Sequence, residues 1–308
     1  MLLRNYLNYS GSKDRIYPTL RTHLERAVKG KKNKHKYLID LFTGSGVVLF
    51  NSVDLFDTLI GVDKCMELVR IHNWITQYPL ERIMFDIEVC IAKYGLSKDN
   101  KEGYLKLRAD YNNEIAEGGF DPVKLYCLIT HAFNYQLHTN KKGEFNVPSG
   151  AGRSYFNPSL RQKLINIKNY LDEQIVVKDG KTNKILLFTG GDCMDFVHCL
   201  NYENKFENVV FYVDPPYSAS ISKHPYRVGN IKWTEEEDRK LFNCLDYINE
   251  NDGKFIFSNV LSNNGVHNIP LKNWADSYDI HPIEVSYENC SYQRKNEGGT
   301  EEVIITNF

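Results

Sequence analysis

No Cys-x-x-Cys pair occurs in this 308-residue sequence, whose seven cysteines are scattered along the chain. Such scattered cysteines favour reduced thiols over disulfides or a zinc site. The sequence also lacks a run of about 18 apolar residues, which a membrane-spanning helix would need. Its N-terminus has no charged-then-apolar signal pattern. We therefore expect a cytoplasmic protein without a metal site and without membrane association.

Neither sign of charge is in excess, because 38 Lys and Arg residues accompany 39 Asp and Glu residues and the net charge is −1. A polyanionic partner would need a locally basic surface instead. Basic residues do cluster between Arg26 and Lys36, at Lys141 and Lys142, and from Lys223 to Arg227. Each cluster is equally compatible with a solvated face and with an anion-binding face.

The most informative stretch is Asp214-Pro215-Pro216-Tyr217, which directly follows the apolar run 209–213. This run is too short for a helix, and its β-branched and aromatic residues predict a buried strand whose end faces a ligand crevice. The prolines lack N–H donors, so the carbonyls of the turn can accept hydrogen bonds from an –NH₂ group. Asp214 adds an acceptor, and Tyr217 adds a ring on which a base can stack, a contact worth about 1–3 kcal/mol. The four residues are therefore candidate catalytic residues that hold a planar amine, with a plain Pro-Pro turn as the alternative.

A second candidate site lies upstream, where a predicted strand from Tyr37 runs through Asp40 and Phe42 to Gly44 and Gly46. Glycines there let the backbone approach a bound cofactor closely. The third glycine of the dinucleotide fingerprint is missing, and no Gly-Lys-Ser/Thr follows. The spacing therefore favours a nucleoside over a pyrophosphate.

Asp63 ends the next predicted strand, which begins at Leu59. A carboxylate at this position can accept hydrogen bonds from ribose hydroxyls. A helix N-cap is the alternative role, but the preceding Gly-rich turn favours ribose binding.

These motifs, and their order along the chain, resemble those of the S-adenosylmethionine-dependent DNA adenine-N6 methyltransferases of Dam type (D12 class). Phage-encoded members of that family look most similar. The resemblance spans the whole chain. It includes the segments Tyr9 to Lys13, Leu105 to Asn112, Trp233 to Glu237, Phe257 to Val260 and Glu302 to Asn307.

The resemblance implies S-adenosylmethionine as the cofactor. The lysine of the family's Y-x-G-x-K segment, here Lys13, neutralises the methionine carboxylate. Asp192 ends the segment 184–192, which resembles a further core strand of the family. It is expected to accept from the cofactor's adenine amine in preference to Asp195, with a helix N-cap as its alternative role. The candidate cofactor-binding residues are Tyr9, Lys13, Asp40, Phe42, Gly44, Gly46, Asp63, Asp192 and Asp214.

The implied fold is an α/β three-layer sandwich with a mostly parallel seven-stranded sheet, which the alternating strand and helix patterns also favour. Residues 1–65 and 180–308 carry the motifs and are predicted to form the catalytic core, with strands near 254–258 and 302–307 and a helix over 233–249. Residues 66–179 lack those motifs, and helical apolar spacing recurs in 105–115 and 121–133. This segment is the predicted target-recognition subdomain.

Within that segment, residues 131–150 predict a helix end followed by a hairpin, whose turn at 140–143 places Gly143 where a positive φ is needed. The resemblance implies that this hairpin approaches the target sequence in DNA. Asn and Gln can pair with adenine, and an aromatic ring can enter the base stack. A hairpin that only closes the subdomain is the alternative. The candidate DNA-binding residues are Phe133, Asn134, Gln136, His138, Asn140, Lys141, Asn146, Pro148 and Arg153.

His138 departs from relatives of GATC specificity, which look to have arginine here and a second arginine where Ala151 falls, two residues before Arg153. An arginine that pairs bidentately with guanine discriminates by about 1–3 kcal/mol. We therefore do not assign GATC as the recognition sequence.

The predicted reaction is transfer of a methyl group to N6 of an adenine flipped out of duplex DNA, because the target amine lies within a stacked base pair. Asp214 and Pro215 would orient the amine and stabilise the charge that grows on nitrogen. Double-stranded DNA is the expected partner, a cognate restriction endonuclease a further one, and a monomer or weak dimer the expected state.

Three other functions stay open. Cytosine-N4 methylation uses a similar amine, but the family's Asp-Pro-Pro-Tyr favours adenine over the Ser-Pro-Pro-Tyr of cytosine enzymes. An RNA or protein-amide methyltransferase would more often carry Asn-Pro-Pro-Tyr. A catalytically silent DNA-binding paralogue would keep the fold, although the intact donor and acceptor motifs argue against it.

Overall fold

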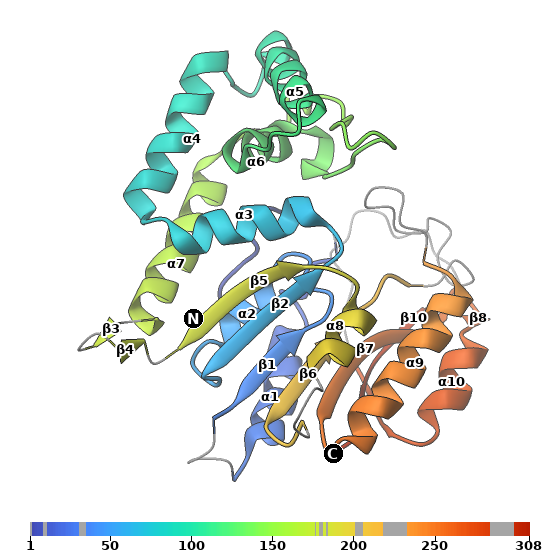
Figure 1. The fold of residues 1–308 in the computed structure, drawn as a ribbon. Coiled ribbons are helices and arrows are strands. Elements are labelled where there is room, and N and C mark those ends of the chain that lie inside the picture. Colours follow the sequence, from blue (N-terminus) through green and yellow to red (C-terminus); the bar gives the residue numbers. More distant parts are fainter. Residues whose placement is uncertain are drawn as a thin grey trace.

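A central β-sheet organises the chain (Figure 1). The structure is a computed structural model that describes residues 2–8, 11–30, 35–175, 177–178, 181–182, 184–200, 206–217, 233–283 and 299–308. In this part of the chain, seven strands lie in the order β5-β2-β1-β6-β7-β10-β9, and a short strand, β8, pairs with β7. Their bounds are β1 Tyr37–Asp40, β2 Thr58–Asp63, β5 Ile185–Gly190, β6 Val209–Val213, β7 Lys254–Asn263, β8 Val266–His267, β9 Asp279–Pro282 and β10 Thr300–Thr306. A separate pair is formed by β3 (Val177–Lys178) and β4 (Lys181–Thr182).

The first five strands of that order are parallel, whereas β10 pairs antiparallel with both β7 and β9. The predicted mostly parallel seven-stranded sheet is therefore confirmed, with β8 as a two-residue addition. Strand β1 has β2 on one side and β6 on the other, so the strand order reverses there. In open α/β sheets, ligands bind in the crevice at the carboxyl ends of such strands.

Alternate residues of the central strands point to opposite faces of the sheet and enter two hydrophobic clusters. Leu38 and Tyr212 belong to one cluster, and Ile39 and Phe211 belong to the other. The first face is covered by α1 (Tyr17–Val28), α2 (Val47–Ser52) and α3 (Met66–Gln77). The second face is covered by α8 (Cys193–Leu200), α9 (Glu235–Glu250) and α10 (Ile269–Ala275), which lie in front of the sheet in Figure 1. The predicted three-layer arrangement is thus confirmed.

Four further helices, termed here the upper helices, lie above or beside α3 in Figure 1. They are α4 (Leu80–Tyr94), α5 (Lys101–Ala116), α6 (Pro122–His131) and α7 (Pro158–Gln174). The cluster on the α3 side of the sheet continues into these helices, where it includes Leu125 and Leu164. The segment therefore shares a core with the sheet, and its division into a subdomain that recognises DNA stays a prediction.

Capping residues set helix starts that apolar spacing alone placed differently. Asn100 accepts a hydrogen bond from the Gly103 N–H at 3.0 Å, so α5 begins before the predicted stretch 105–115. Thr234 caps α9 in the same way, which leaves Trp233 outside this helix.

The predicted site residue Tyr9 and the basic cluster 223–227 lie outside the described residues.

Candidate active site

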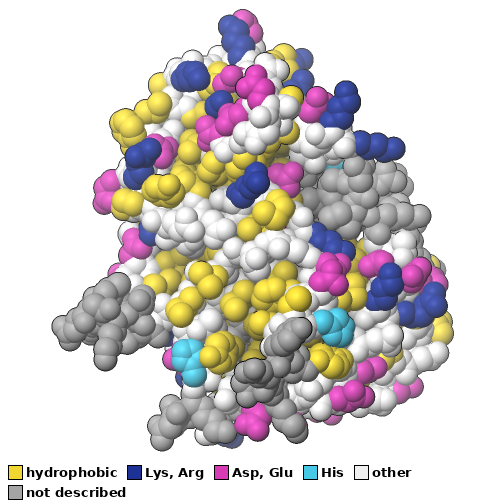
Figure 2. All heavy atoms as spheres, viewed as in Figure 1, with side chains coloured by type: hydrophobic (Ala, Val, Ile, Leu, Met, Phe, Trp, Pro, Cys, Tyr) yellow, Lys and Arg dark blue, Asp and Glu magenta, His cyan; other side chains and the backbone are white. Residues whose placement is uncertain are grey.

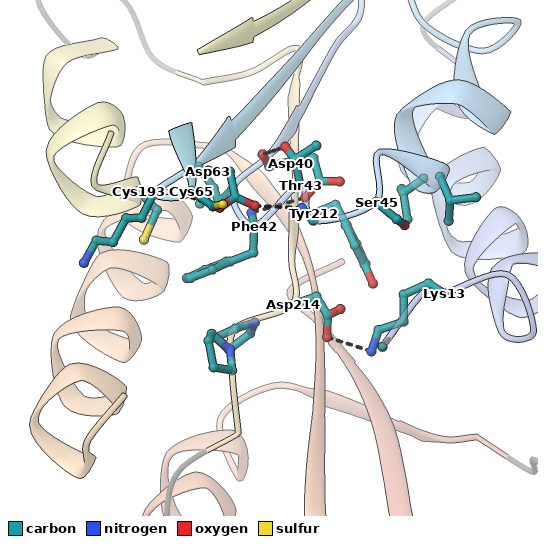
Figure 3. Close-up of a pocket in the computed structure, with 18 of the residues that line it drawn as sticks. Lys13, Asp40, Phe42, Thr43, Ser45, Asp63, Cys65, Cys193, Tyr212 and Asp214 are labelled. Atoms are coloured by element: carbon teal, nitrogen blue, oxygen red, sulfur yellow. Dashed lines mark hydrogen bonds and ion pairs between the residues drawn. The ribbon is translucent and has the colours of Figure 1, made fainter. Parts of the chain in front are cut away.

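The carboxyl ends of β1, β2, β5 and β6 surround one pocket (Figure 3). Lys13 and Tyr217, which are 204 positions apart in the sequence, both face this space and lie within hydrogen-bonding distance. The predicted site residues that line the pocket are Lys13, Asp40, Phe42, Gly44, Asp63, Asp214, Pro215, Pro216 and Tyr217. The fold therefore brings the two candidate sites of the sequence into a single cavity.

The Gly-rich turn after β1 is fixed to the end of β2 by the Asp63 carboxylate. The N–H groups of Gly44 and Cys65 each donate to one oxygen of Asp63, both at 2.8 Å. Gly44 and Gly46 have φ values of +48° and +71°, in the left-handed region that favours glycine. Burial raises the pKa of Asp63, and these N–H donors oppose the shift. Each carboxylate oxygen can accept a second hydrogen bond, so the group still offers acceptors to a ligand.

Asp40, the last residue of β1, is almost fully buried, with 1% of its surface exposed. Its Oδ1 accepts from the Phe42 N–H at 3.2 Å. Burial raises the pKa of Asp40 well above its usual value, and the neighbouring Asp214 and Asp63 add to the rise. Asp40 therefore holds a proton more readily than a solvated carboxyl, and a protonated carboxyl can donate as well as accept.

Lys13 and Asp214 form an ion pair across the pocket, with 2.9 Å between Lys13 Nζ and Asp214 Oδ1. Figure 3 shows the two side chains pointing toward each other from separate segments. Lys13 Nζ also donates to the Tyr217 hydroxyl at 3.3 Å. Burial raises the pKa of Asp214, and Lys13 opposes this shift. Burial alone would lower the pKa of Lys13, but Asp214 and Tyr217 together outweigh it, and the pKa rises above its usual value.

Two predicted cofactor residues lie beside the pocket wall rather than on it. Gly46 is the N-cap of α2, next to pocket residue Ser45. Asp192 accepts from the Met194 N–H at 2.8 Å, and its other oxygen pairs with Lys64 Nζ at 2.6 Å. The carboxylate thus caps α8, the alternative that the sequence left open, and contact with the cofactor's adenine stays a prediction.

Residues 132–149 form a hairpin, termed here the ribbon. The bridge Thr139↔Phe145 joins its arms, and Gly143 has a φ of +80° in the predicted turn. Inward and outward residues alternate along both arms, and those facing inward are Leu137, Thr139, Phe145 and Val147. Of the candidate DNA-binding residues, Phe133, Asn134, Gln136, Lys141, Asn146, Pro148 and Arg153 are exposed, whereas His138 and Asn140 are half-buried.

Helix α5 holds the ribbon from the inside. Asn112 accepts from the Phe145 N–H at 2.8 Å and donates to the Phe145 carbonyl at 3.0 Å. The Tyr104 hydroxyl donates to the Val147 carbonyl at 2.8 Å. These residues were missed as site residues, although Asn112 closes the stretch 105–112 that supported the family resemblance. Their contacts leave the outer side of the ribbon available to a partner.

Charged side chains of both signs are intermixed over the upper helices on the face shown in Figure 2. On α4, Arg82 pairs with Asp86 at 2.8 Å, and on α5 Lys106 pairs with Glu102 at 2.9 Å. At the ribbon turn, by contrast, Lys141 is exposed and forms no ion pair with any residue that the structure describes. The ribbon turn therefore offers an exposed positive charge that no ion pair among the described residues neutralises.

The family model of the D12 class N6 adenine-specific DNA methyltransferases matches residues 9–289, nearly the whole chain. The chain belongs to this family. The family's name gives DNA as the substrate of its members and N6 of adenine as the atom that they methylate.

Several relatives of this chain are named as adenine or type II methyltransferases. The type II methyltransferase M.FokI of Planomicrobium okeanokoites is 33% identical over 309 residues, covering 99% of this chain and 43% of that protein. The DNA adenine methylase of Haemophilus influenzae is 26% identical over 215 residues, covering 70% and 64% respectively. A phage relative, the DNA N-6-adenine-methyltransferase of Escherichia phage P1, is 21% identical over 249 residues, covering 80% and 29%. The chain thus spans less than half the length of M.FokI.

The pocket includes residues that sequence reasoning did not single out. Trp233 meets the Phe42 ring edge-on, with 5.4 Å between ring centroids, and its indole N–H donates to Asp238 at 2.6 Å. The signal for Trp233 was its place at the start of the family segment 233–237. The other lining residues outside the predicted set are Gly11, Leu41, Thr43, Ser45, Val47, Val48, Lys64, Cys65, Gly191, Cys193 and Tyr212.

The described residues hold neither a cluster of metal-ligating side chains nor a membrane-spanning helix. They contain no group of three or more His, Cys, Asp and Glu side chains that could hold a metal ion. Among the helices in the described ranges, none has the length and apolar character needed to cross a membrane. The oligomeric state and a cytoplasmic location stay predictions.

Proposed function

We propose that this D12 methyltransferase transfers the methyl group of S-adenosylmethionine to N6 of an adenine flipped out of double-stranded DNA. One observation carries the proposal: the turn 214–217, the Gly-rich turn and Asp63 line the same pocket. An acceptor site for an amine therefore adjoins a site suited to a nucleoside. Membership of the D12 class supports the same reaction.

The donor set in the pocket fits S-adenosylmethionine, which supplies an activated methyl group on a sulfonium when bound. Asp63 would accept from the ribose hydroxyls through its remaining lone pairs. The backbone at Gly44 would approach the nucleoside, and Phe42 would offer its ring to the base. Lys13, buried beside Asp214, would neutralise the methionine carboxylate.

The turn 214–217 would hold the target amine. Asp214 and the Pro215 carbonyl would accept its two N–H groups, which orients the nitrogen lone pair and stabilises the positive charge that grows on it. Lys13 favours the ionised form of Asp214, because the ion pair offsets the effect of burial. Tyr217, anchored by Lys13 through its hydroxyl, would stack on the extruded base.

The outer side of the ribbon would contact the DNA. His138 Nδ1 and Asn146 Oδ1 lie 2.7 Å apart on opposite arms, so the two side chains form one polar unit. We propose that this pair helps to set the recognition sequence, and we do not assign GATC because His138 replaces the arginine expected for it.

The test is methylation of plasmid DNA by the purified protein with S-adenosylmethionine, followed by mass spectrometry of the nucleosides and single-molecule sequencing. N6-methyladenine in one short motif, absent with Asp214→Ala, would support the proposal. N4-methylcytosine would identify the rival base. No modified base, despite measured DNA binding, would point to a silent paralogue.

A further inference from the structure

We infer that His72 is a positioning residue for the methyl-donor site, because its imidazole fixes the conformation of the turn at Gly44. The inference rests on the proposed function, since it assigns that turn to donor binding. His72 lies on α3, outside every motif that identified the site, and it does not line the pocket.

Both ring nitrogens of His72 have a partner. Nε2 lies 2.9 Å from the Gly44 carbonyl oxygen, and Nδ1 lies 2.7 Å from the Tyr6 hydroxyl. A carbonyl only accepts, so Nε2 must carry the proton. Nδ1 is then the acceptor, and the Tyr6 hydroxyl donates to it. The two contacts together specify one neutral tautomer.

The packing around His72 leaves the ring little freedom. The side chain is fully buried and stacks on Phe188, with ring centroids 4.6 Å apart and planes 26° apart. Tyr6 and Phe50 meet the ring edge-on. Burial lowers the pKa of His72 to about 4, which keeps the ring neutral at physiological pH.

Hydrogen bonds hold the turn at both backbone groups of Gly44. The Gly44 N–H donates to Asp63, and the Gly44 carbonyl accepts from His72. A side chain at Gly46 would have its Cβ 2.7 Å from Phe50 and 3.1 Å from His72 Cε1. The turn therefore cannot shift toward α3 without displacing His72. The position of the His72 ring thus determines where the turn lies at the donor site.

The test compares donor binding by wild type, His72→Phe and His72→Gln, with His23→Phe as the matched control. His23 is also buried, lies on α1, and its Nδ1 has no hydrogen-bond partner among the described residues. Calorimetry with S-adenosylmethionine should show a Kd about tenfold higher for His72→Phe, the effect expected when a buried carbonyl loses its donor. His72→Gln keeps a side-chain N–H and should recover part of the affinity, and His23→Phe should bind as wild type does.

Two further readouts separate positioning from general destabilisation. In methylation assays, His72→Phe should raise KM for the donor and leave kcat at saturating donor within about twofold. Without any ligand, hydrogen exchange should accelerate at the amides of residues 44–46 but not in β6. An unchanged Kd and unchanged exchange in folded His72→Phe would overturn the inference.

The design also distinguishes the inference from the proposed function. Wild type that fails to bind S-adenosylmethionine would overturn the proposed function, whereas the exchange measurement would still decide whether His72 holds the turn. If His72→Phe does not fold, Tyr6→Phe removes only the hydroxyl that donates to His72 Nδ1. A Kd for Tyr6→Phe equal to that of wild type would then count against the inference.

Discussion

Lys13 is the residue on which the charge balance of the pocket depends. Burial pushes the neighbouring carboxyls toward their protonated forms, and the Lys13 ammonium, 2.9 Å from Asp214, opposes this for Asp214. The Asp214 carboxylate, which is proposed to accept hydrogen bonds from an amine, therefore depends on the ammonium group of Lys13, a residue far away in the sequence.

Substitution of Lys13 by Met should shift the pH dependence of methylation. The pKa of Asp214, already raised by burial, would rise further without the ammonium, so the carboxylate would form only at higher pH. The acidic limb of the kcat profile should therefore move upward by about one pH unit or more. Arg21→Met, which breaks the more exposed pair with Asp54, is the control and should keep the wild-type profile. A profile for Lys13→Met identical to that of wild type would contradict this role.

His72 should make the stability of the fold depend on pH. The unfolded histidine binds a proton below about pH 6.5, whereas burial lowers the pKa in the folded state to about 4. The unfolded state therefore binds more protons between these values, and stability falls as the pH drops through this window. Urea titrations should show wild type losing about 2 kcal/mol more than His72→Gln between pH 7 and pH 5. Equal losses in the two proteins would contradict the assignment of a neutral, buried ring.

The ribbon shows which parts of an element could be predicted from its sequence. Gly143 predicted the turn at 140–143, and the structure has both this turn and the hairpin predicted around it. The hydrogen bonds between α5 and the ribbon could not be predicted, because Asn112 and Phe145 are 33 positions apart and no local sequence pattern links them.

Strand β9 was missed for a different reason. It is a four-residue edge strand with the sequence Asp-Ile-His-Pro, which is too short to show a pattern and ends in a proline, a residue atypical of strand interiors.

Release of the ribbon from α5 should impair DNA binding alone. Asn112→Ala removes both hydrogen bonds to the Phe145 backbone and should weaken binding to cognate DNA about tenfold, since the free ribbon must be ordered on binding. Fluorescence anisotropy with labelled duplex would measure this, and calorimetry should show unchanged affinity for S-adenosylmethionine. Asn113→Ala, at the exposed neighbouring position on the same helix, is the matched control. Equal losses of DNA and donor affinity would indicate general damage instead.

At the scale of the whole molecule, one hydrophobic cluster crosses the boundary that the motifs suggested. It joins Leu38 in the sheet to Leu125 in α6. The motif positions correctly placed the sheet and its parallel strands, because those motifs occupy strand ends. The motifs could not show that the sheet and the upper helices share a core. The sequence of a helix does not reveal which residues its buried leucines contact.

The shared core predicts that the sheet and the upper helices unfold together. Leu125→Ala should cost about 2–5 kcal/mol and should lower the melting temperature reported by both parts. Calorimetry should show one transition, and hydrogen exchange should show β1 and α6 losing protection together. Phe85→Ala, on α4 with 61% of the side chain exposed, should change stability little. Two separate transitions, with only the upper one shifted by Leu125→Ala, would contradict a common core.

The alternation along the ribbon has a consequence for how such a protein can change over time. Leu137, Phe145 and Val147 anchor the ribbon, whereas the proposed reading residues occupy the intervening positions. Substitutions at Gln136 or Asn146 can therefore accumulate without opening a cavity in the core. Such a surface lets selection alter the preferred target while the chemistry beneath it is preserved, and the same separation gives protein engineers a compact set of positions to randomise.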